Sequence, residues 1–300
     1  MPIIEHNFTD IDEFWKFISP DGEIVNQMGQ ISYPIFRGQG DASWTLHPAA
    51  LRKNVIDKYM HERHVYSQTD HVIFFEFDLL SAYIHYSDEM ALTIPGDSQQ
   101  FREDTDFYNF ANRFGSIANE WPTNNFYPLL ASAQHHGIPT RLLDWSRSPF
   151  VAAYFAATQA LNFDINEKEK EIVVWAADVN KIDRLKHETD ESITQIEFLS
   201  LPGVTSKNLA AQKGCFILLK WIMGQSRDNR FNPGTSIEQI LSDNKEINLY
   251  KITLPHKQVG ELLLKCKKYG FSAATLFPGS DGAGRAATEF KLAKLRADRM

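Results

Sequence analysis

The strongest constraint on the fold is an apolar run from Ile172 to Ala177, where six consecutive residues are aliphatic or aromatic. β-Branched residues and Trp175 favour a strand over a helix for a run of this length. A strand with one face in water alternates polar and apolar residues, and this run does not alternate. The stretch from Glu171 to Val179 is therefore predicted to be an interior strand of a sheet.

Helix and strand patterns are mixed along the rest of the chain, with several strands late, which predicts an α+β fold with helical N-terminal and central segments. Further extended segments are expected at residues 31–39, 43–48, 214–219, 247–254 and 275–282. Helices are expected at residues 11–18, 49–64, 71–90, 106–117, 126–136, 148–160, 235–243 and 257–269, and over the last twenty residues. Thr9 is expected to cap the first helix, and the polar residues 92–106 are expected to form a loop.

The composition limits the setting of the protein. A chain of 300 residues with 43% hydrophobic residues can bury a large core, and its net charge of −7 argues against a broad nucleic-acid-binding face. Cys215 and Cys266 lie in apolar segments without metal-ligand spacing, as is typical of buried thiols in a reducing compartment. The sequence shows no signal peptide and no membrane-spanning run, so a cytoplasmic protein without a membrane partner is expected.

A polar segment, residues 134–146, connects two apolar segments that are expected to be helical. Connections of this kind are often open at their middle, where functional residues tend to lie. The alternative is a structural turn, in which Gly137 and Pro139 shape the backbone and Arg141 pairs with Asp144. Both interpretations remain open from the residues alone.

Arg37 ends a predicted strand and precedes Gly38, which has no side chain. An arginine in that position can reach over a small-residue floor toward a phosphate or carboxylate, which its planar guanidinium binds through two hydrogen bonds. The alternative is that Arg37 pairs with a carboxylate such as Asp144 and only stabilises the fold.

These segments resemble the FRG domain, a family named after the tripeptide found here as Phe36-Arg37-Gly38. The resemblance rests on Phe36-Arg37-Gly38-Gln39, Trp44, Leu46, Pro48, Arg52, the string from Ala133 to Ser146, Pro149, Ala152, Tyr154-Phe155-Ala156, Gln212, Gly214, Phe216, Leu276-Phe277-Pro278 and Asp281-Gly282. It implies an FRG domain over residues 31–282 with a helical insertion at about 71–125. Residues 1–30 are then a helical extension and residues 283–300 a C-terminal helix. The family is largely without an assigned activity.

The order of these segments is also similar to that of ADP-ribosyltransferases of the Arg-Ser-Glu type. In this comparison Arg37-Gly38 is the first element, Asp144-Trp145-Ser146 with the following helix is the second, and Gln212 is the third. The comparison implies a mixed, split β-sheet with a pocket for NAD or a related nucleotide. Its cofactor-binding residues would be Arg37, Gly38, Gln39, Trp145 and Ser146, with Arg37 on the pyrophosphate and Trp145 stacked on nicotinamide.

This comparison implies Arg37, Ser146 and Gln212 as catalytic residues, and Gln212 departs from the pattern. His136 is a further catalytic candidate, because one of the adjacent residues His135 and His136 can reach the site as a general acid or base. These enzymes have a catalytic Glu at the third position, whereas Gln212 can hydrogen-bond a ribose hydroxyl but cannot act as a general base. Either Glu289 or Asp281 replaces that acid, or the pocket binds a nucleotide without transferring it. His136, Trp145 and Ser146 are thus expected to face a ligand, and Arg141 and Asp144 to hold the turn.

Two further patterns concern metal and phosphate binding. His135 and His136 are adjacent on a predicted helix, so their side chains point about 100° apart and do not bind one metal. With His47 and His64 they show no ligand spacing, and no metal is expected. The glycines at residues 281–285 allow a phosphate loop, but a turn capped by an aspartate is favoured.

The expected function is therefore ADP-ribosyl transfer or NAD hydrolysis, in a toxin or an antiphage defence role, with a protein or nucleic acid as the acceptor. A non-catalytic nucleotide-binding or sensor module is the first alternative. Nucleic-acid processing is the second, and it requires a local basic groove.

Overall fold

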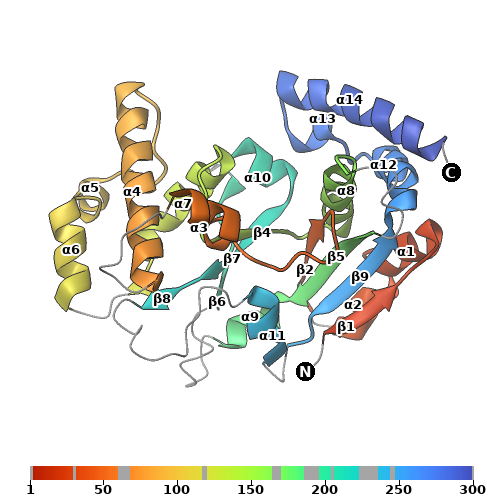
Figure 1. Cartoon of the computed structure of the whole chain (residues 1–300), viewed down its shortest axis with the longest axis horizontal. Coiled ribbons are helices and arrows are strands. Elements are labelled where there is room, and N and C mark those ends of the chain that lie inside the picture. The colour runs from red at the N-terminus through yellow and green to blue at the C-terminus, as the bar shows by residue number, and fades with distance from the viewer. Residues whose placement is uncertain are drawn as a thin grey trace.

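The computed structural model describes residues 3–29, 32–59, 68–116, 120–163, 170–185, 196–203, 206–222, 236–243 and 247–298. Over these residues the chain has an α+β fold, in which fourteen helices surround an open, mixed sheet of seven strands (Figure 1). A second sheet of two short strands lies beside the helical segments. The predicted fold class is confirmed.

The strands are β1 (Ile4–Asn7), β2 (Pro34–Gln39), β3 (Glu120–Trp121), β4 (Leu142–Ser146), β5 (Glu171–Asp178), β6 (Ile196–Leu199), β7 (Gly214–Leu219), β8 (Trp221–Ile222) and β9 (Tyr250–Pro255). The helices are α1 (Ile11–Ile18), α2 (Glu23–Met28), α3 (Lys53–Tyr59), α4 (Gln68–Glu89), α5 (Gln99–Asp104), α6 (Phe107–Ser116), α7 (Tyr127–His135), α8 (Pro149–Ala160), α9 (Val179–Leu185), α10 (Lys207–Ala211), α11 (Ile237–Asp243), α12 (Val259–Lys268), α13 (Ala273–Leu276) and α14 (Ser280–Ala297). Short 3-10 helices lie at Ala49–Leu51, Asn124–Phe126 and His256–Gln258.

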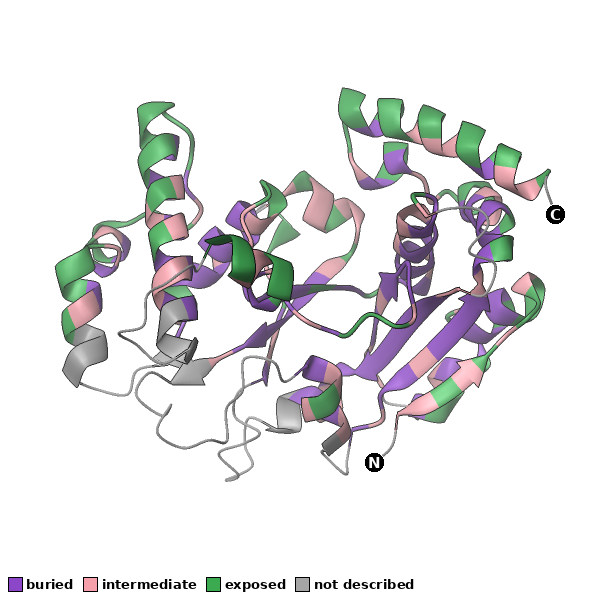
Figure 2. Cartoon of the chain, in the orientation of Figure 1, coloured by how far each residue is buried: buried purple, intermediate pink, exposed green. Residues whose placement is uncertain are grey.

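β5 is an interior strand, as its apolar run predicts. The strand order is β1-β9-β5-β2-β4-β7-β6, and β1 and β9 are its one parallel pair among the described strands. Val173 and Trp175 belong to one hydrophobic core, and Val174 and Ala176 belong to another on the opposite face. All four are at most 3% exposed, since each face of the strand belongs to a hydrophobic core, and Figure 2 colours β5 as buried over most of its length.

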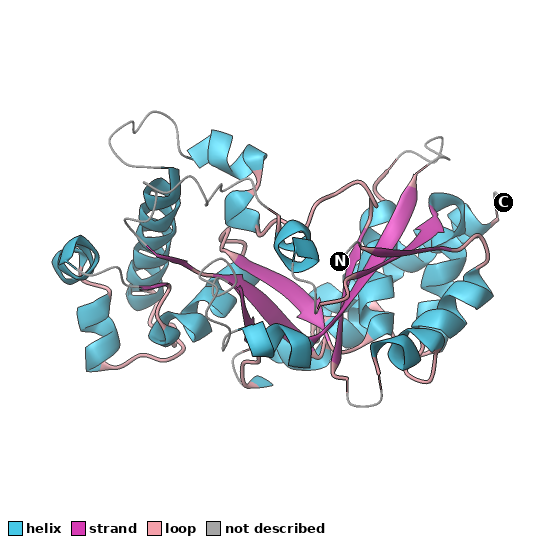
Figure 3. Cartoon of the chain, turned by 90° about the horizontal axis from the view of Figure 1, so that it is seen from below, coloured by secondary structure: helices cyan, strands magenta, loops and turns pink. Residues whose placement is uncertain are grey.

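Helices cover both faces of the sheet (Figure 3). α8 and α12 pack on the face that carries Val174, together with α1 and α14, and α7 and α4 contribute to the core on the other face. α4, α5 and α6 lie together at one end of the molecule, where the sequence predicted a helical insertion (Figure 1).

The sheet is nearly divided between β2 and β4. These two strands share one residue pair, Phe36 with Ser146, whereas β2 and β5 share six pairs and β4 and β7 share five. Beyond that pair β2 and β4 diverge, so the residues that follow Phe36 pair with β5 on one side but with no strand on the side of β4. The side chain of Arg37 reaches from β2 to the backbone of β4.

Gly38 allows α8 to pack directly on β2. A Cβ atom at this position would lie 1.9 Å from the carbonyl oxygen of Ala152, which is a backbone atom and cannot move independently. Gly38→Ala is therefore expected to lower the free energy of unfolding by about 1–3 kcal/mol, measured by urea denaturation. Gly284→Ala on α14 is the control, because a Cβ atom there meets nothing within 4 Å. That substitution should raise stability by about 0.5–1 kcal/mol through helix propensity. Equal effects of the two substitutions would contradict the close packing.

The N-terminal segment differs from the sequence prediction in two respects. β1 precedes the first helix and pairs with β9, so residues 1–30 contain a strand as well as helices. The cap of α1 is Asp10 rather than Thr9, because one carboxylate oxygen of Asp10 accepts hydrogen bonds from the backbone of Asp12 and Glu13 at 2.9 and 3.0 Å.

Other local predictions were also wrong. Residues 275–282 contain no strand: Thr275 and Leu276 end α13, residues 277–279 form a turn, and Asp281 and Gly282 lie in the first turn of α14. α5 lies within the expected loop 92–106, and residues 43–48 do not pair with a strand. Residues 60–64 of the expected helix, with His64, lie outside the described residues. Within the described part of the chain, no helix is long and apolar enough to cross a membrane.

Candidate functional site

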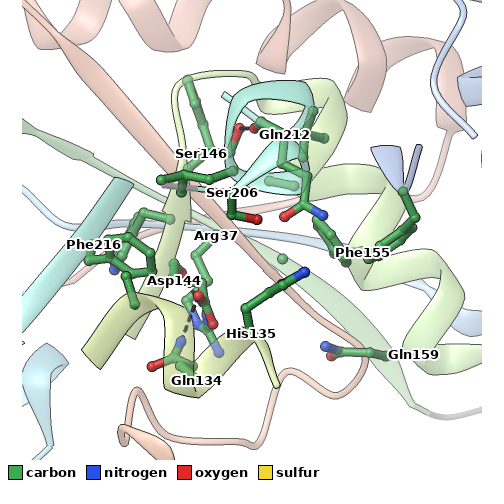
Figure 4. Close-up of a pocket in the computed structure, with 18 of the residues that line it drawn as sticks. Arg37, Gln134, His135, Asp144, Ser146, Phe155, Gln159, Ser206, Gln212 and Phe216 are labelled. Atoms are coloured by element: carbon green, nitrogen blue, oxygen red, sulfur yellow. Dashed lines mark hydrogen bonds and ion pairs between the residues drawn. The ribbon is translucent and has the colours of Figure 1, made fainter. Parts of the chain in front are cut away.

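A pocket of about 400 Å³ opens where β2 and β4 diverge (Figure 4). Its polar lining residues are Arg37, Arg52, Gln134, His135, Asp144, Ser146, Gln159, Ser206 and Gln212. Phe36, Phe155, Phe216 and Phe277 form much of its apolar wall. Segments far apart in the sequence thus meet here, and the structure brings Arg37, Ser146 and Gln212 to one pocket.

The side chain of Arg37 lines the pocket and is 11% exposed. Its Nη1 atom donates a 2.6 Å hydrogen bond to the carbonyl oxygen of Asp144 and lies 4.0 Å from Oδ2 of the same residue. Nε is buried, and neither Nε nor Nη2 has a hydrogen-bond partner among the described residues. Burial lowers the pKa of Arg37 to about 10, with Asp144 opposing this decrease and Arg52 adding to it. Arg37 is therefore a cation at neutral pH with one edge free for an anion.

Asp144 is the one acidic residue among the described residues that line the pocket. Its Oδ1 atom accepts a 2.7 Å hydrogen bond from Nε2 of Gln134, and Oδ2 has no hydrogen-bond partner among the described residues. The side chain of Asp144 is 65% exposed, but the surrounding protein still desolvates the carboxylate. That desolvation raises the pKa of Asp144, although Arg37, the Gln134 hydrogen bond and Arg52 oppose the shift.

Gln134 is oriented by a second hydrogen bond. The hydroxyl group of Thr140 donates to Oε1 of Gln134, which leaves the amide NH2 group to face Asp144. Because Thr140 is fully buried, it fixes the amide and, through it, the carboxylate. Oδ2 of Asp144 is thereby held toward the pocket while Oδ1 is occupied.

His135 lines the pocket, whereas His136 does not. His136 caps the C-terminus of α7, is exposed, and has its ring centroid 6.2 Å from that of Tyr83. Nε2 of His135 lies 2.8 Å from the side-chain nitrogen of Asn208. Burial lowers the pKa of His135, His136 adds to the decrease, and Asp144 opposes it, so His135 is neutral at pH 7. His136, which was predicted to act as a general acid or base, therefore lies outside the pocket.

Ser146 and Gln212 hold the wall of the pocket together. The Ser146 hydroxyl donates a 2.7 Å hydrogen bond to the carbonyl oxygen of Gln212 and accepts one of 3.0 Å from the backbone of Ser148. Nε2 of Gln212 donates a 3.1 Å hydrogen bond to the carbonyl oxygen of Leu276. Since its one proton is already donated, Ser146 can only accept a hydrogen bond from a ligand, and it does not bond to Arg37.

Trp145 and Gln39, which were predicted to contact a cofactor, are buried in the core. Trp145 is 3% exposed, so its ring cannot stack on a ligand in this arrangement. Gln39 is 4% exposed and uses both ends of its amide within the protein, at Trp175 and at the backbone of Thr45. Gly38 does line the pocket, as a floor between β2 and α8.

Arg141 stabilises the segment as expected, but its partner is Glu76 rather than Asp144. Both side chains are fully buried, and Nε of Arg141 lies 2.6 Å from Oε2 of Glu76. Oε1 of Glu76 accepts the backbone N–H of Arg141 at 2.8 Å, and Oε2 also accepts the indole N–H of Trp121 at 2.8 Å. Asp144 is also tied to this segment, through the hydrogen bond from Gln134, and as part of β4 it lines the pocket as well.

The two acids considered as replacements for a catalytic Glu lie outside the pocket. Glu289 accepts a 2.8 Å hydrogen bond from the hydroxyl of Tyr154, and burial raises the pKa of Glu289. Asp281 is exposed on α14. Asp144 is the acid that sequence reasoning missed, although a lone charged residue inside an otherwise apolar strand segment was a signal for it. In the described part of the chain, no three His, Cys, Asp or Glu side chains gather closely enough to hold a metal ion.

Comparisons with known proteins agree with the sequence resemblance. Residues 32–165 match the model of the FRG domain family. This range contains β2, α7, β4 and α8, and therefore both Arg37 and Asp144, whereas Gln212 lies beyond it. Searches among curated proteins and among solved structures give no match to the chain. Residues 32–165 of this chain are an FRG domain.

Proposed function

We propose that the pocket binds NAD or a related dinucleotide, with its phosphates on Arg37 and its reacting ribose beside Asp144. The observation that carries the proposal is that Nη2 of Arg37 and Oδ2 of Asp144 have no hydrogen-bond partner among the described residues and belong to the same pocket, with Oδ2 lying 4.0 Å from Nη1 of Arg37. A guanidinium edge matches two oxygens of a phosphate group. A carboxylate fixed nearby can stabilise the positive charge that develops when a glycosidic bond breaks.

The reaction supported by this pair is transfer of the ADP-ribosyl group. The bond between C1′ of the nicotinamide ribose and the nicotinamide nitrogen breaks, and its electron pair leaves with neutral nicotinamide. The Asp144 carboxylate stabilises the oxocarbenium charge on the ribose. Oδ2 then accepts the proton of the nucleophile that bonds to C1′, which is water in hydrolysis or a group on a protein or nucleic acid in transfer. With water, the products are ADP-ribose, nicotinamide and a proton released to solvent.

A non-catalytic nucleotide sensor is the second candidate, and Gln212 favours it. In the sequence resemblance to ADP-ribosyltransferases, Gln212 takes the place of the catalytic Glu, and its Nε2 atom donates a hydrogen bond to the backbone of Leu276. An amide at this position cannot take up a proton. In the sensor the same pocket would bind the nucleotide and leave it intact.

Calorimetric titration with NAD and ADP-ribose, followed by chromatography of released nicotinamide, separates the two candidates. For an enzyme, wild-type protein binds NAD and releases nicotinamide, and Asp144→Asn keeps the affinity but slows release by about 100-fold or more. For a sensor, wild-type protein binds without release. Failure of the wild-type protein to bind either nucleotide, with and without cell extract, would reject both.

The pH dependence of nicotinamide release should report the Asp144 carboxyl group. Desolvation raises the pKa of Asp144 above its ordinary value of 3.8, and only the ionised form can stabilise a cation. The rate is therefore expected to be constant at higher pH and to fall as the pH decreases through this raised pKa. Asp144→Asn should remove the acidic limb. A wild-type rate that stays constant down to the ordinary range of aspartate would contradict the role of Asp144.

A further inference from the structure

A second pocket of about 800 Å³ adjoins the first, on the side of the segment between β2 and α3. The two pockets share the side chains of Arg37, Arg52 and Gln159. These shared side chains lie at the boundary, so a single ligand that passes over them would occupy both pockets.

The described charged side chains that line the second pocket are all cationic. Arg37, Arg52 and Lys53 line it, and its described lining residues include no Asp or Glu. Neither Arg52 nor Lys53 forms an ion pair with a described residue. Nε of Arg52 donates a 3.2 Å hydrogen bond to the carbonyl oxygen of His47, which positions the guanidinium group. Two arginines at the boundary therefore offer a binding site for a group with more than one negative charge.

Trp44 supplies an aromatic surface in the same pocket. It is 43% exposed, unlike the other described aromatic residues of the two pockets, and its ring contacts Phe163 at a centroid distance of 5.7 Å. The segment that carries Trp44 is fixed by hydrogen bonds. Asp41 accepts from the backbone and hydroxyl of Ser43 at 2.9 and 2.6 Å, and Glu238 accepts from the backbone of Leu46 at 2.7 Å. An exposed, fixed indole beside cations is suited to stacking on a nucleobase whose phosphates the cations bind.

We infer that the ligand extends across both pockets, with its diphosphate on Arg37 and Arg52 and its adenine base stacked on Trp44. This inference rests on the proposed function and specifies it. The nicotinamide ribose lies in the first pocket beside Asp144, and the adenosine half lies in the second. The protein then recognises the ADP part of its ligand mainly through residues 44–53, which are separate from the reacting group.

Calorimetric titration of four nucleotides tests this placement: NAD, ADP-ribose, AMP and nicotinamide mononucleotide. Trp44→Ala is expected to weaken binding of NAD, ADP-ribose and AMP by about tenfold or more, as loss of base stacking requires, and to leave nicotinamide mononucleotide unchanged. Trp44→Phe keeps a ring and should show a smaller loss. Tyr108→Ala, at a 77% exposed aromatic residue on α6, is the control and should change no affinity.

The outcomes separate this inference from the proposed function. If wild-type protein binds NAD tightly but Trp44→Ala, with an unchanged unfolding temperature, binds all four nucleotides as wild type does, the placement of adenine is wrong. If Trp44→Ala slows transfer to an acceptor at unchanged affinity for ADP-ribose, the second pocket binds the acceptor instead, which also overturns the inference. If wild-type protein binds none of the four, the proposed function fails as well.

Discussion

Replacing Glu76 with leucine is expected to lower the free energy of unfolding by about 3–5 kcal/mol. Glu76 is fully buried and accepts three hydrogen bonds, from Nε and the backbone of Arg141 and from the indole of Trp121. Its removal leaves the Arg141 guanidinium as a buried charge without its counter-ion. The cost is large because the attraction of Glu76 no longer offsets the desolvation of that charge. Chemical denaturation followed by tryptophan fluorescence would measure it.

Two control variants make this result interpretable. The double variant Glu76→Leu/Arg141→Met removes both charges and should recover a substantial part of the lost stability. Arg102→Ala breaks a surface cluster in which Arg102 pairs with Asp88 and Asp97 at 2.5 and 2.6 Å. That change should cost much less, since exposed ion pairs contribute little. If the double variant is less stable than Glu76→Leu, the buried charge is not the source of the loss.

Arg37→Ala is expected to have the largest effect on ligand binding. Loss of a charge-assisted contact to phosphate costs about 1.5–3 kcal/mol, which corresponds to a Kd for NAD raised roughly 10- to 150-fold. Arg37→Lys keeps the charge but cannot present the Nε–Nη2 edge, so its Kd should lie between those of wild type and Arg37→Ala. Calorimetric titration at fixed ionic strength provides the comparison.

The control for this prediction is Arg102→Ala, which removes the same charge from the helical end of the molecule, outside both pockets. Its affinity for NAD should equal that of wild type. Each variant needs an unfolding temperature, because Arg37 also bonds to the backbone of β4 and its loss can loosen that strand. A folded Arg37→Ala protein that binds NAD as tightly as wild type would rule out Arg37 as the phosphate site.

The parts of the fold that the sequence predicted are those determined by local pattern. The interior position of β5 follows from Ile172 to Ala177, and β7, β9 and α8 were located from similar runs. Residues 275–282 were misassigned because their glycines and proline indicate a turn. Residues 277–279 do form a turn, but the helices on its two sides depend on a capping box at Ser272 and on packing between α13, α14 and α12. Such contacts between distant segments have no local pattern.

The sequence predicted that the segments of the site lie together, but not which of their side chains face the pocket. The Arg37-Gly38 pair and residues 134–146 do meet, as their resemblance to known motifs implied. Arg141 was expected to pair with Asp144 within the turn, but its partner Glu76 is 65 positions away on α4. Treating residues 142–146 as a strand would have separated Asp144 from Trp145, since neighbouring residues on a strand point to opposite sides. Which of two adjacent histidines faces a pocket depends on the exact end of α7, which propensity does not give.

The single residue pair between β2 and β4 has a further consequence for how this domain can change. Few backbone hydrogen bonds fix the distance between the two halves of the sheet, so a ligand that contacts both halves must bind across a spacing set mainly by side chains. Substitutions at Phe36 or Ser146 would therefore change affinity through this spacing, in addition to any contact that these residues make with the ligand. Preference among ligands of different length can therefore diverge between related domains while Arg37 and Asp144 stay the same.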